Sequence, residues 1–382
     1  MRRWVPAWAR LAVLAAVLST LAGCAADKPK PTELEVFKPQ IAGRQVWSAR
    51  LDSVQFPLAV AVQGGSFVVA GTDGTVLALD AQSGRELWRG QAGAKLSAGV
   101  GSDGRFAAVV TTDNELVVLD KGAKLWSTRL GSRTSTAPLV AGERVFVVGV
   151  DRVVHAFDVI DGHRLWTFQR AGEALTLAQP GVLAAYKNTL VAGIGALMMG
   201  LDPTTGSVRW EVAVTSPRGT NEVERLNDLV GPVLRVGDTL CVRAFQTAVG
   251  CVALTGTGTA ADRATGRWSR NAGGQQAVGG DAELVFGADA TDRVSAWRAG
   301  AGELAWTHDR LLYRRLSAPL SAGKTVMLGD FEGQVHFLAR EDGKTLLRLP
   351  TDGSPVVAQP VLSGTTALVV TRNGGLFAFR PE

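Results

Sequence analysis

Tryptophan recurs along this chain at a nearly constant interval. Successive members are 41, 38, 40, 44, 58 and 38 residues apart, and Leu347 keeps the same phase 41 residues after the last of them. An interval of about 40 residues with strand-like patterning is typical of propellers and solenoids, whose units bury their apolar faces only against one another. The recurring residues are Trp47, Trp88, Trp126, Trp166, Trp210, Trp268 and Trp306. The repeat therefore predicts a propeller or a solenoid, and catalysis is a less expected function for such a chain.

Each repeat also contains a tight turn at a set distance before the tryptophan. In the clearest copy an alternating stretch ends at Asp80, Gly84 follows, and a short stretch then leads to Trp88. Aspartate begins such turns through its side chain, and glycine supplies the positive φ that they require. A further hairpin precedes this one, as at Gly64-Gly65. We therefore expect four short antiparallel strands per repeat and an all-β fold.

The two ends of the array complete each other. The turn-bearing hairpin occurs eight times, and the last copy, around Gly374, reaches the C-terminus before any tryptophan-bearing strand. Trp47 is the opposite case, because no hairpin precedes it. Pairing the strand at 44–49 with the C-terminal unit leaves no open sheet edge. The sequence thus predicts an eight-bladed β-propeller of four-stranded antiparallel blades, closed by the strand near Trp47.

The repeated residues are expected to serve structure rather than chemistry. A tryptophan on the outermost strand fills the wedge against the next sheet, and losing one costs about 3–5 kcal/mol. The recurring carboxylates follow turn geometry, which favours capping of backbone amides over acid–base catalysis. These acids are Asp80, Asp120, Asp158 and Asp202.

The N-terminus reads as a secretory signal that ends on a cysteine. Three arginines and an apolar run occupy the first 21 residues, and 21–24 reads Leu-Ala-Gly-Cys. This resembles the bacterial lipobox, in which the cysteine is acylated, and predicts a signal peptide at 1–23 and lipidation of Cys24. An ordinary signal with an incidental cysteine is the alternative. Ala25 resembles the sorting pattern of the outer membrane rather than the inner membrane.

The next segment is polar and contains several prolines, and it is too poor in apolar residues to fold alone. We expect 24–40 to hold the lipidated cysteine and a flexible tether, and 41–382 to form the propeller. Removing the three signal arginines leaves 37 basic residues (40 − 3) against 35 acidic ones, a net charge of +2. No Lys/Arg cluster is interleaved with aromatic residues, so nucleic acid is not an expected partner.

Two further cysteines lie ten residues apart around one predicted turn. Cys241 and Cys251 face each other across a hairpin in one register, and a shift by one residue places them on opposite faces. An oxidising compartment permits a disulfide, whose geometry is strict. Both states stay open from the sequence.

No catalytic or metal-binding constellation is recognisable. The four histidines, His155, His163, His308 and His336, are scattered without metal-ligand spacing, and those at 155 and 336 fall on predicted strands. The glycines lie at turns, and none forms a phosphate loop that opens a helix. We therefore expect no catalytic residue, no metal and no cofactor. The repeat resembles that of PQQ-dependent quinoprotein dehydrogenases, which keeps a quinoprotein or another small-ligand-binding propeller as the alternative, although the paired adjacent cysteines of many such enzymes are missing.

The array is least regular between the fourth and fifth repeats. From each tryptophan to the proline that opens the next repeat is 12 to 14 residues at Trp126, Trp166 and Trp306, but 22 at Trp210. The extra stretch, 219–228, is charged with apolar residues, and the preceding loop of the same class carries Leu175 and Leu177. Such loops emerge on one face, so the two predict a protein-binding patch. The alternative is that the leucines begin the next strand and that Arg225 pairs with Glu222 or Glu224.

A second irregularity, at 256–261, reads Gly-Thr-Gly-Thr-Ala-Ala and accounts for much of the 58-residue gap between tryptophans. Its low complexity predicts a flexible surface turn without an assigned role.

Together these features resemble the BamB family, the lipoprotein subunits of the outer-membrane β-barrel assembly (BAM) machinery. The resemblance spans nearly the whole chain, and its most specific part is Glu-Val-Glu-Arg-Leu-Asn-Asp at 222–228. It implies a scaffold on the periplasmic face of the outer membrane, held by its lipid anchor, which binds the POTRA domains of the central barrel subunit and assists the folding and insertion of outer-membrane proteins. Unfolded clients are a further implied partner, through strand addition. The partner-binding residues implied are Leu175, Leu177, Arg225, Leu226 and Asp228.

Two positions depart from the family pattern. Ala178 stands where an arginine normally follows the Leu-x-Leu pair, and Val230 replaces a second acidic residue. Both changes remove charge, so the resemblance implies a contact with weaker salt dependence or with compensation elsewhere.

Overall fold

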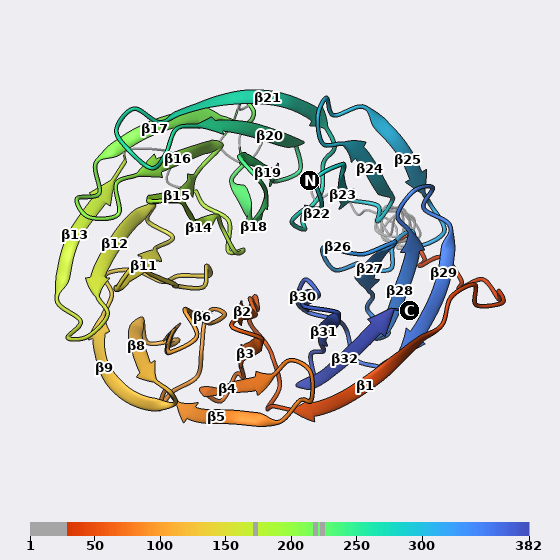
Figure 1. Cartoon of the computed structure of the whole chain (residues 1–382), viewed down its shortest axis with the longest axis horizontal. Coiled ribbons are helices and arrows are strands. Elements are labelled where there is room, and N and C mark those ends of the chain that lie inside the picture. The colour runs from red at the N-terminus through yellow and green to blue at the C-terminus, as the bar shows by residue number, and fades with distance from the viewer. Residues whose placement is uncertain (1–28, 171–174, 217–220, 222–225, 382) are drawn as a thin grey trace, which may run out of the picture.

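The chain forms a closed ring of eight four-stranded antiparallel sheets (Figure 1). The computed structural model describes residues 29–170, 175–216, 221 and 226–381. Over these residues every regular element is a strand, and no helix is long and apolar enough to span a bilayer. The eight-bladed all-β architecture predicted from the repeat is confirmed.

The blades are numbered in chain order, and each is given from its inner to its outer strand. Blade 1 comprises β2 (Ala61–Gln63), β3 (Ser66–Ala70), β4 (Thr75–Asp80) and β5 (Glu86–Gln91). Blade 2 comprises β6 (Gly101–Ser102), β7 (Phe106–Val110), β8 (Glu115–Asp120) and β9 (Ala123–Arg129). Blade 3 comprises β10 (Leu139–Ala141), β11 (Arg144–Val148), β12 (Val153–Asp158) and β13 (Arg164–Gln169). Blade 4 comprises β14 (Leu183–Tyr186), β15 (Thr189–Ile194), β16 (Leu197–Leu201) and β17 (Val208–Ala213).

The second half of the ring follows the same plan. Blade 5 comprises β18 (Leu229–Val236), β19 (Thr239–Ala244), β20 (Ala248–Thr255) and β21 (Arg263–Asn271). Blade 6 comprises β22 (Gly279–Gly280), β23 (Leu284–Ala288), β24 (Val294–Arg298) and β25 (Leu304–His308). Blade 7 comprises β26 (Leu320–Ala322), β27 (Thr325–Gly329), β28 (Gln334–Ala339) and β29 (Thr345–Pro350). Blade 8 comprises β30 (Val361–Ser363), β31 (Thr366–Val370), β32 (Gly375–Pro381) and β1 (Gly43–Arg50).

Blade 8 closes the ring with strands from both ends of the chain. β1 pairs antiparallel with β32, and Trp47 lies opposite Ala378. Beyond the strand, the amide of Leu51 donates to the carbonyl of Gly374 at 2.9 Å. The predicted closure near Trp47 is therefore confirmed, and β1 covers the outer edge of β32, which would otherwise be unpaired.

The core lies in the second and third strands of each blade. All five residues of β3, β7, β23, β27 and β31 are buried, whereas the outer strands are mostly exposed or half-buried, as in β5 and β9. Sheets packed on both faces need continuous apolar runs, and edge strands need only every second residue apolar.

The repeated tryptophans lock each blade to the next. Five indole N–H groups donate to a backbone carbonyl in the following blade at 2.8–3.0 Å, and each of these rings lies over the glycine of that blade's turn. These glycines have φ between +69° and +74°, so a Cβ there meets both the ring and a strained backbone. The pairs are Trp47 with Gly84, Trp126 with Gly162, Trp166 with Gly206, Trp268 with Gly302, and Trp306 with Gly343.

Trp88 and Trp210 precede the two turns that depart from the repeat. Blade 2 turns in two residues at Lys121-Gly122, and blade 5 has the long segment 256–262. Asp80, Asp158 and Asp202 cap backbone amides of their turns. The turn after Asp120 is too short for such a cap, and Asp120 instead pairs with the side chain of Arg105 at 2.7 Å.

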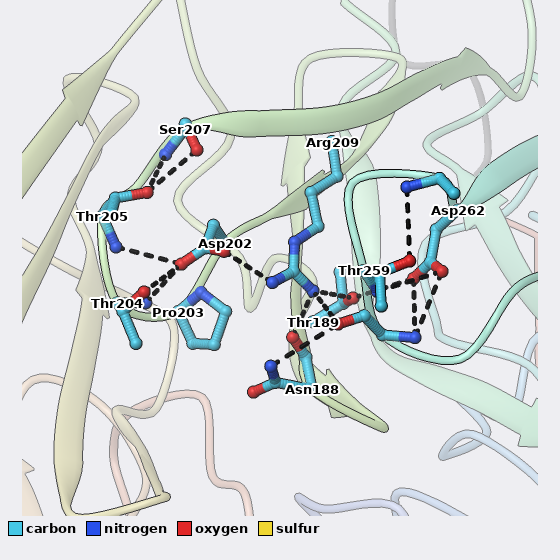
Figure 2. A network of polar contacts seen from close by, with 12 residues as sticks. Asn188, Thr189, Asp202, Pro203, Thr204, Thr205, Ser207, Arg209, Thr259 and Asp262 are labelled. Atoms are coloured by element: carbon cyan, nitrogen blue, oxygen red, sulfur yellow. Dashed lines mark hydrogen bonds and ion pairs between the residues drawn. The ribbon is translucent and has the colours of Figure 1, made fainter.

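The segment 256–262 is pinned to blade 4 by a polar network (Figure 2). Asp262 is almost fully buried and accepts from the amides of Gly258 and Thr259 at 3.1 Å, and the guanidinium of Arg209 joins the Gly258 carbonyl to the Asp202 carboxylate. These bonds hold the pKa of Asp262 below its usual value despite its burial. The expected flexible turn is therefore a fixed contact between blades 4 and 5, because a buried carboxylate organises the glycine amides.

Cys241 and Cys251 lie directly opposite each other on β19 and β20. The structure joins them by a disulfide, with Cα atoms 4.0 Å apart. Of the two registers that the sequence left open, this is the one in which both side chains share a face.

Residues 29–42 lie along blades 6 and 7 and make side-chain and backbone contacts with them. The prediction of a flexible tether at 24–40 therefore does not hold for the part of it that the structure describes. Cys24 and the signal peptide lie outside the described residues.

Candidate protein-interaction site

Two interblade loops and one hairpin turn meet between blades 3, 4 and 5. The first loop joins β13 to β14 and contains Leu175 and Leu177, and the second joins β17 to β18 and ends at Asp228. The hairpin turn between β11 and β12 contains Arg152. The leucines precede β14 by several residues, so the alternative that they begin the next strand is wrong.

The carboxylate of Asp228 holds the two loops together. One oxygen accepts from the backbone amide of Leu177 at 2.9 Å, and the other accepts from the guanidinium of Arg152 at 3.2 Å. The same guanidinium nitrogen donates to the carbonyl of Leu175 at 3.0 Å. We call Arg152, Asp228 and the backbone of 175–177 the loop clamp. Its two charged side chains are 13% and 15% exposed, so the pair is shielded from solvent without being closed off from it.

Further hydrogen bonds tie the loop clamp to turns of the neighbouring blades. The hydroxyl of Thr176 donates to the carbonyl of Val150 at 3.0 Å, and the amide of Phe245 donates to the carbonyl of Asp228 at 3.0 Å. Leu229, which begins β18, donates to the carbonyl of Gly195 at 3.0 Å. The loop ends are thereby tied to blades 3, 4 and 5, which places the leucines on a rigid base.

The clamp presents apolar surface outward and charge inward. Leu175 is 38% exposed, among the larger values for a large apolar side chain, while Leu177 and Leu226 are partly buried. Arg225 and the segment 222–225 lie outside the described residues. The carboxylate of Asp228 is engaged within the protein, so its geometry suits positioning of the leucines more than direct contact.

Arg152 was missed by the sequence analysis. It occupies the last position of a hairpin turn with φ of +63°, where the other repeats place residues such as Gly74, Asn114 and Gly374. An arginine that accepts a left-handed backbone is uncommon. That departure within the repeat was the available signal. A cavity of about 60 Å³ lies beside its side chain, and its Nε atom is buried without a hydrogen-bond partner.

The two departures from the family pattern differ in placement. Ala178 is exposed beside the clamp, whereas Val230 is 3% exposed within β18. A valine at 230 packs in the core, so the absence of an acidic residue there does not change the surface charge of this protein.

The comparisons with known proteins agree over nearly the whole chain. A family model described as "Outer membrane protein assembly factor BamB" matches residues 35–96 and 72–308. The protein of that name from Burkholderia pseudomallei (strain K96243) is 36% identical over 98% of this chain and 98% of its own length. The chain belongs to the BamB family. The relatives are named outer membrane protein assembly factors.

Solved structures support the fold of this BamB-family chain. BamB from Moraxella catarrhalis, 22% identical, matches with a TM-score of 0.78 over 89% of this chain and all of that one. A quinohemoprotein alcohol dehydrogenase from Pseudomonas putida HK5, 15% identical, matches with a TM-score of 0.61 over 88% of this chain and 76% of that one. The propeller is thus shared by assembly factors and enzymes, and fold does not separate them.

The titratable residues of this BamB-family chain form no arrangement typical of catalysis within the described ranges. His336 and His308 are buried, His155 is half-buried, and burial lowers the pKa of all three. Asp158, Asp161 and His163 bring ligand atoms within 4.8 Å of one another, but the group is mostly exposed. Exposed acidic groups of this kind are ordinary at turns, where they cap amides.

The central channel contains a cavity of about 480 Å³, lined by apolar residues and by glutamines such as Gln179, Gln276 and Gln359. None of the described residues that line it is charged. A second cavity, of about 600 Å³, lies next to it and includes Arg315 and Arg372. A carboxylated cofactor would find its counter-charges in the second cavity and not in the channel itself.

Proposed function

We propose that the protein is a non-enzymatic scaffold lipoprotein of the outer-membrane β-barrel assembly machinery. Acylated Cys24 holds it on the periplasmic face of the outer membrane, and the two clamped loops bind the POTRA domains of the central barrel subunit. In this role it assists the folding and insertion of outer-membrane proteins. Membership of the BamB family supports the setting, and the loop clamp supports the site.

The observation that carries the site is the clamp itself. Exposed leucines on free loops lose much of their binding energy to ordering, whereas leucines held by a charge-assisted network bind without that cost. Leu175 and Leu177 supply the apolar contact, while Asp228 and Arg152 position them. Arg225 and Leu226 belong to the proposed contact through the family resemblance.

Replacing Leu175 by Asp is expected to weaken binding to purified POTRA domains by about 10- to 100-fold, because it puts a charge into the centre of an apolar contact. Leu304 provides a matched control, since it is an exposed leucine on β25 in blade 6. Its replacement by Asp should leave the affinity unchanged. Equal affinity of both variants and the parent protein would refute the assignment of the site.

Transient contact with unfolded outer-membrane clients is a further part of the proposal, through strand addition at exposed outer strands. The alternative function is a PQQ-dependent quinoprotein or another small-ligand-binding propeller, for which the cavity with Arg315 and Arg372 is the place to look. A bound chromophore in the absorption spectrum of protein purified from its native membrane would favour that alternative.

A further inference from the structure

Residues 32–41 run along the outside of blade 7 (Figure 1, red segment beside β29). We call this segment the strap. At its start, the amide of Thr32 donates to the carbonyl of Leu312, and the guanidinium of Arg314 donates to the carbonyl of Thr32, both at 3.0 Å. At its end, the amide of Gln40 donates to the carbonyl of Leu346 on β29 at 2.8 Å.

The side chains of the strap are sorted between inside and outside. Leu34 packs against the apolar cluster between blades 6 and 7, and the ring of Phe37 lies 5.1 Å from the guanidinium carbon of Arg348. Val36 points to solvent and is fully exposed. Leu34 and Phe37 are three residues apart and both face the blades, so the strap does not follow the period-two alternation of a β-strand.

Glu35 is the polar centre of the strap. Its carboxylate accepts from the hydroxyl of Thr345 at 2.9 Å and lies 3.4 Å from Arg310, and its carbonyl accepts from the guanidinium of Arg348 at 3.2 Å. Bonds at three points, together with the buried face of Leu34, attach the strap to both blades. A free tether would make none of these contacts.

Docking shortens the link to the membrane. From Cys24 to Gly43, the first strand residue, the separation is 19 residues (43 − 24), which span at most about 65 Å when extended. From Cys24 to Thr32 it is eight residues (32 − 24), which span at most about 28 Å.

Docking also selects a face of the ring. Thr32 is bonded to the loop between β25 and β26, which is of the same class as the two loops of the clamp. Loops that join an outer strand to the next inner strand emerge on one face of a propeller.

We propose that the docked strap shortens the link between the propeller and the membrane, and that it brings the membrane anchor to the face of the ring that carries the loop clamp. This inference rests on the acylation of Cys24, which is part of the proposed function. It implies that the loops work at a limited height above the bilayer, within reach of a partner that is itself embedded there.

The test uses the full acylated chain in liposomes that contain acceptor-labelled lipids. A fluorescent amino acid at Asp113, in a turn on the loop-bearing face, or at Glu143, in a turn on the opposite face, reports the distance to the membrane. We expect stronger energy transfer from position 113 than from 143. The double variant Leu34→Ser, Glu35→Ala should lose this difference and lower the transfer from position 113, whereas Val36→Ser, which changes the outward face, should match the parent.

Hydrogen exchange tests the docking without the membrane. The amides of Thr32 and Gln40 should exchange roughly tenfold or more slowly than free amides in the parent, and at nearly the free rate in the double variant. Unprotected amides in the parent, or an unchanged transfer difference in a double variant whose amides are free, would overturn the inference.

The outcomes also separate this inference from the proposed function. POTRA binding by the double variant in detergent should equal that of the parent, because the loop clamp is untouched. If the mass of the mature chain shows no acyl group on Cys24, both the lipid anchor and the shortened membrane link are refuted. Binding of POTRA domains through the loops is tested separately by its own affinity measurement.

Discussion

Two arginine–aspartate pairs hold interblade loops in this propeller, and they differ in burial. In the loop clamp the side chains of Arg152 and Asp228 are 13% and 15% exposed. On the other side of the ring those of Arg314 and Asp330 are 4% and 0% exposed, with 2.8 Å between Nε and the carboxylate. The second pair also bonds to His336 at 2.9 Å and, through Arg314, to the strap. We call it the strap clamp.

The difference indicates what each pair does. A pair that water can reach gains little net stability, and its worth lies in positioning the groups it joins. A fully buried pair has lost its hydration, so removing one partner leaves an uncompensated charge in the interior. We therefore expect changes in the loop clamp to act on binding, and changes in the strap clamp to act on folding.

The largest expected effect is that of Asp330→Ala. It removes one of the two carboxylates that pair with the buried Arg314, which keeps Glu332, and it takes away the acceptor of His336 and the cap of the amides of Glu332 and Gln334. Together these losses cost about 3–5 kcal/mol of unfolding free energy. Denaturant unfolding followed by tryptophan fluorescence measures it. Asp120→Ala, which opens the exposed pair with Arg105, is the control and should cost much less. Equal losses in the two variants would contradict the contrast between buried and accessible pairs.

A second prediction concerns pH. Burial lowers the pKa of His336, whose Nδ1 has no hydrogen-bond partner and whose neighbour Asp330 is already neutralised by Arg314. The folded state therefore keeps this imidazole neutral at pH values where the unfolded chain, with a pKa of about 6.5, binds a proton. Stability is thus fully present above the unfolded value and falls as pH drops below it, by up to about 1.4 kcal/mol per pH unit for each such histidine.

The measurement is the free energy of unfolding between pH 7.5 and 5.5, in the parent and in His336→Gln. The glutamine variant should show a shallower loss with falling pH, even where its stability at pH 7.5 is lower. A parent protein whose stability rises as the pH falls through this range would contradict the neutral assignment.

The two clamps also separate what the sequence predicts from what it leaves open. Trp47 and the last hairpin predicted ring closure, because every repeat carries the same spacing and the same strand pattern, and the two ends of the chain each carry the part that the other lacks. The contact between Asp228 and Leu177 joins residues 51 positions apart, and no local pattern encodes it. The sequence could therefore find the loops, by their length, and could not show that the acid faces inward.

The strap is a second case in which the sequence does not show contacts between residues far apart in the chain. The strap and the residues just before it have the composition of a linker, with three prolines between 29 and 39 and four charged residues between 30 and 38, and on composition alone the segment was predicted to be flexible. Its order comes from groups far away in the chain, since Thr345 and Arg348 lie more than 300 residues from Glu35. Only the ring closure brings these segments together. Propensity arguments fail where the partner surface is built by the fold as a whole.

The smallest expected change in stability, and the sharpest test of the comparison, is Arg152→Gly. Losing the pair with Asp228 costs below about 1 kcal/mol, and glycine relieves a left-handed backbone by a similar amount, so the unfolding free energy should stay nearly constant. The affinity for POTRA domains should nevertheless fall about tenfold, because the carbonyl of Leu175 and the carboxylate of Asp228 lose the donor that aligns them. Asn114→Gly makes the corresponding change in blade 2, at φ of +62°, and should leave the affinity unaltered. If Arg152→Gly binds like the parent, the arginine is dispensable for positioning. If it unfolds the protein, the loop clamp is a folding element like its buried counterpart, and the distinction between the two clamps disappears.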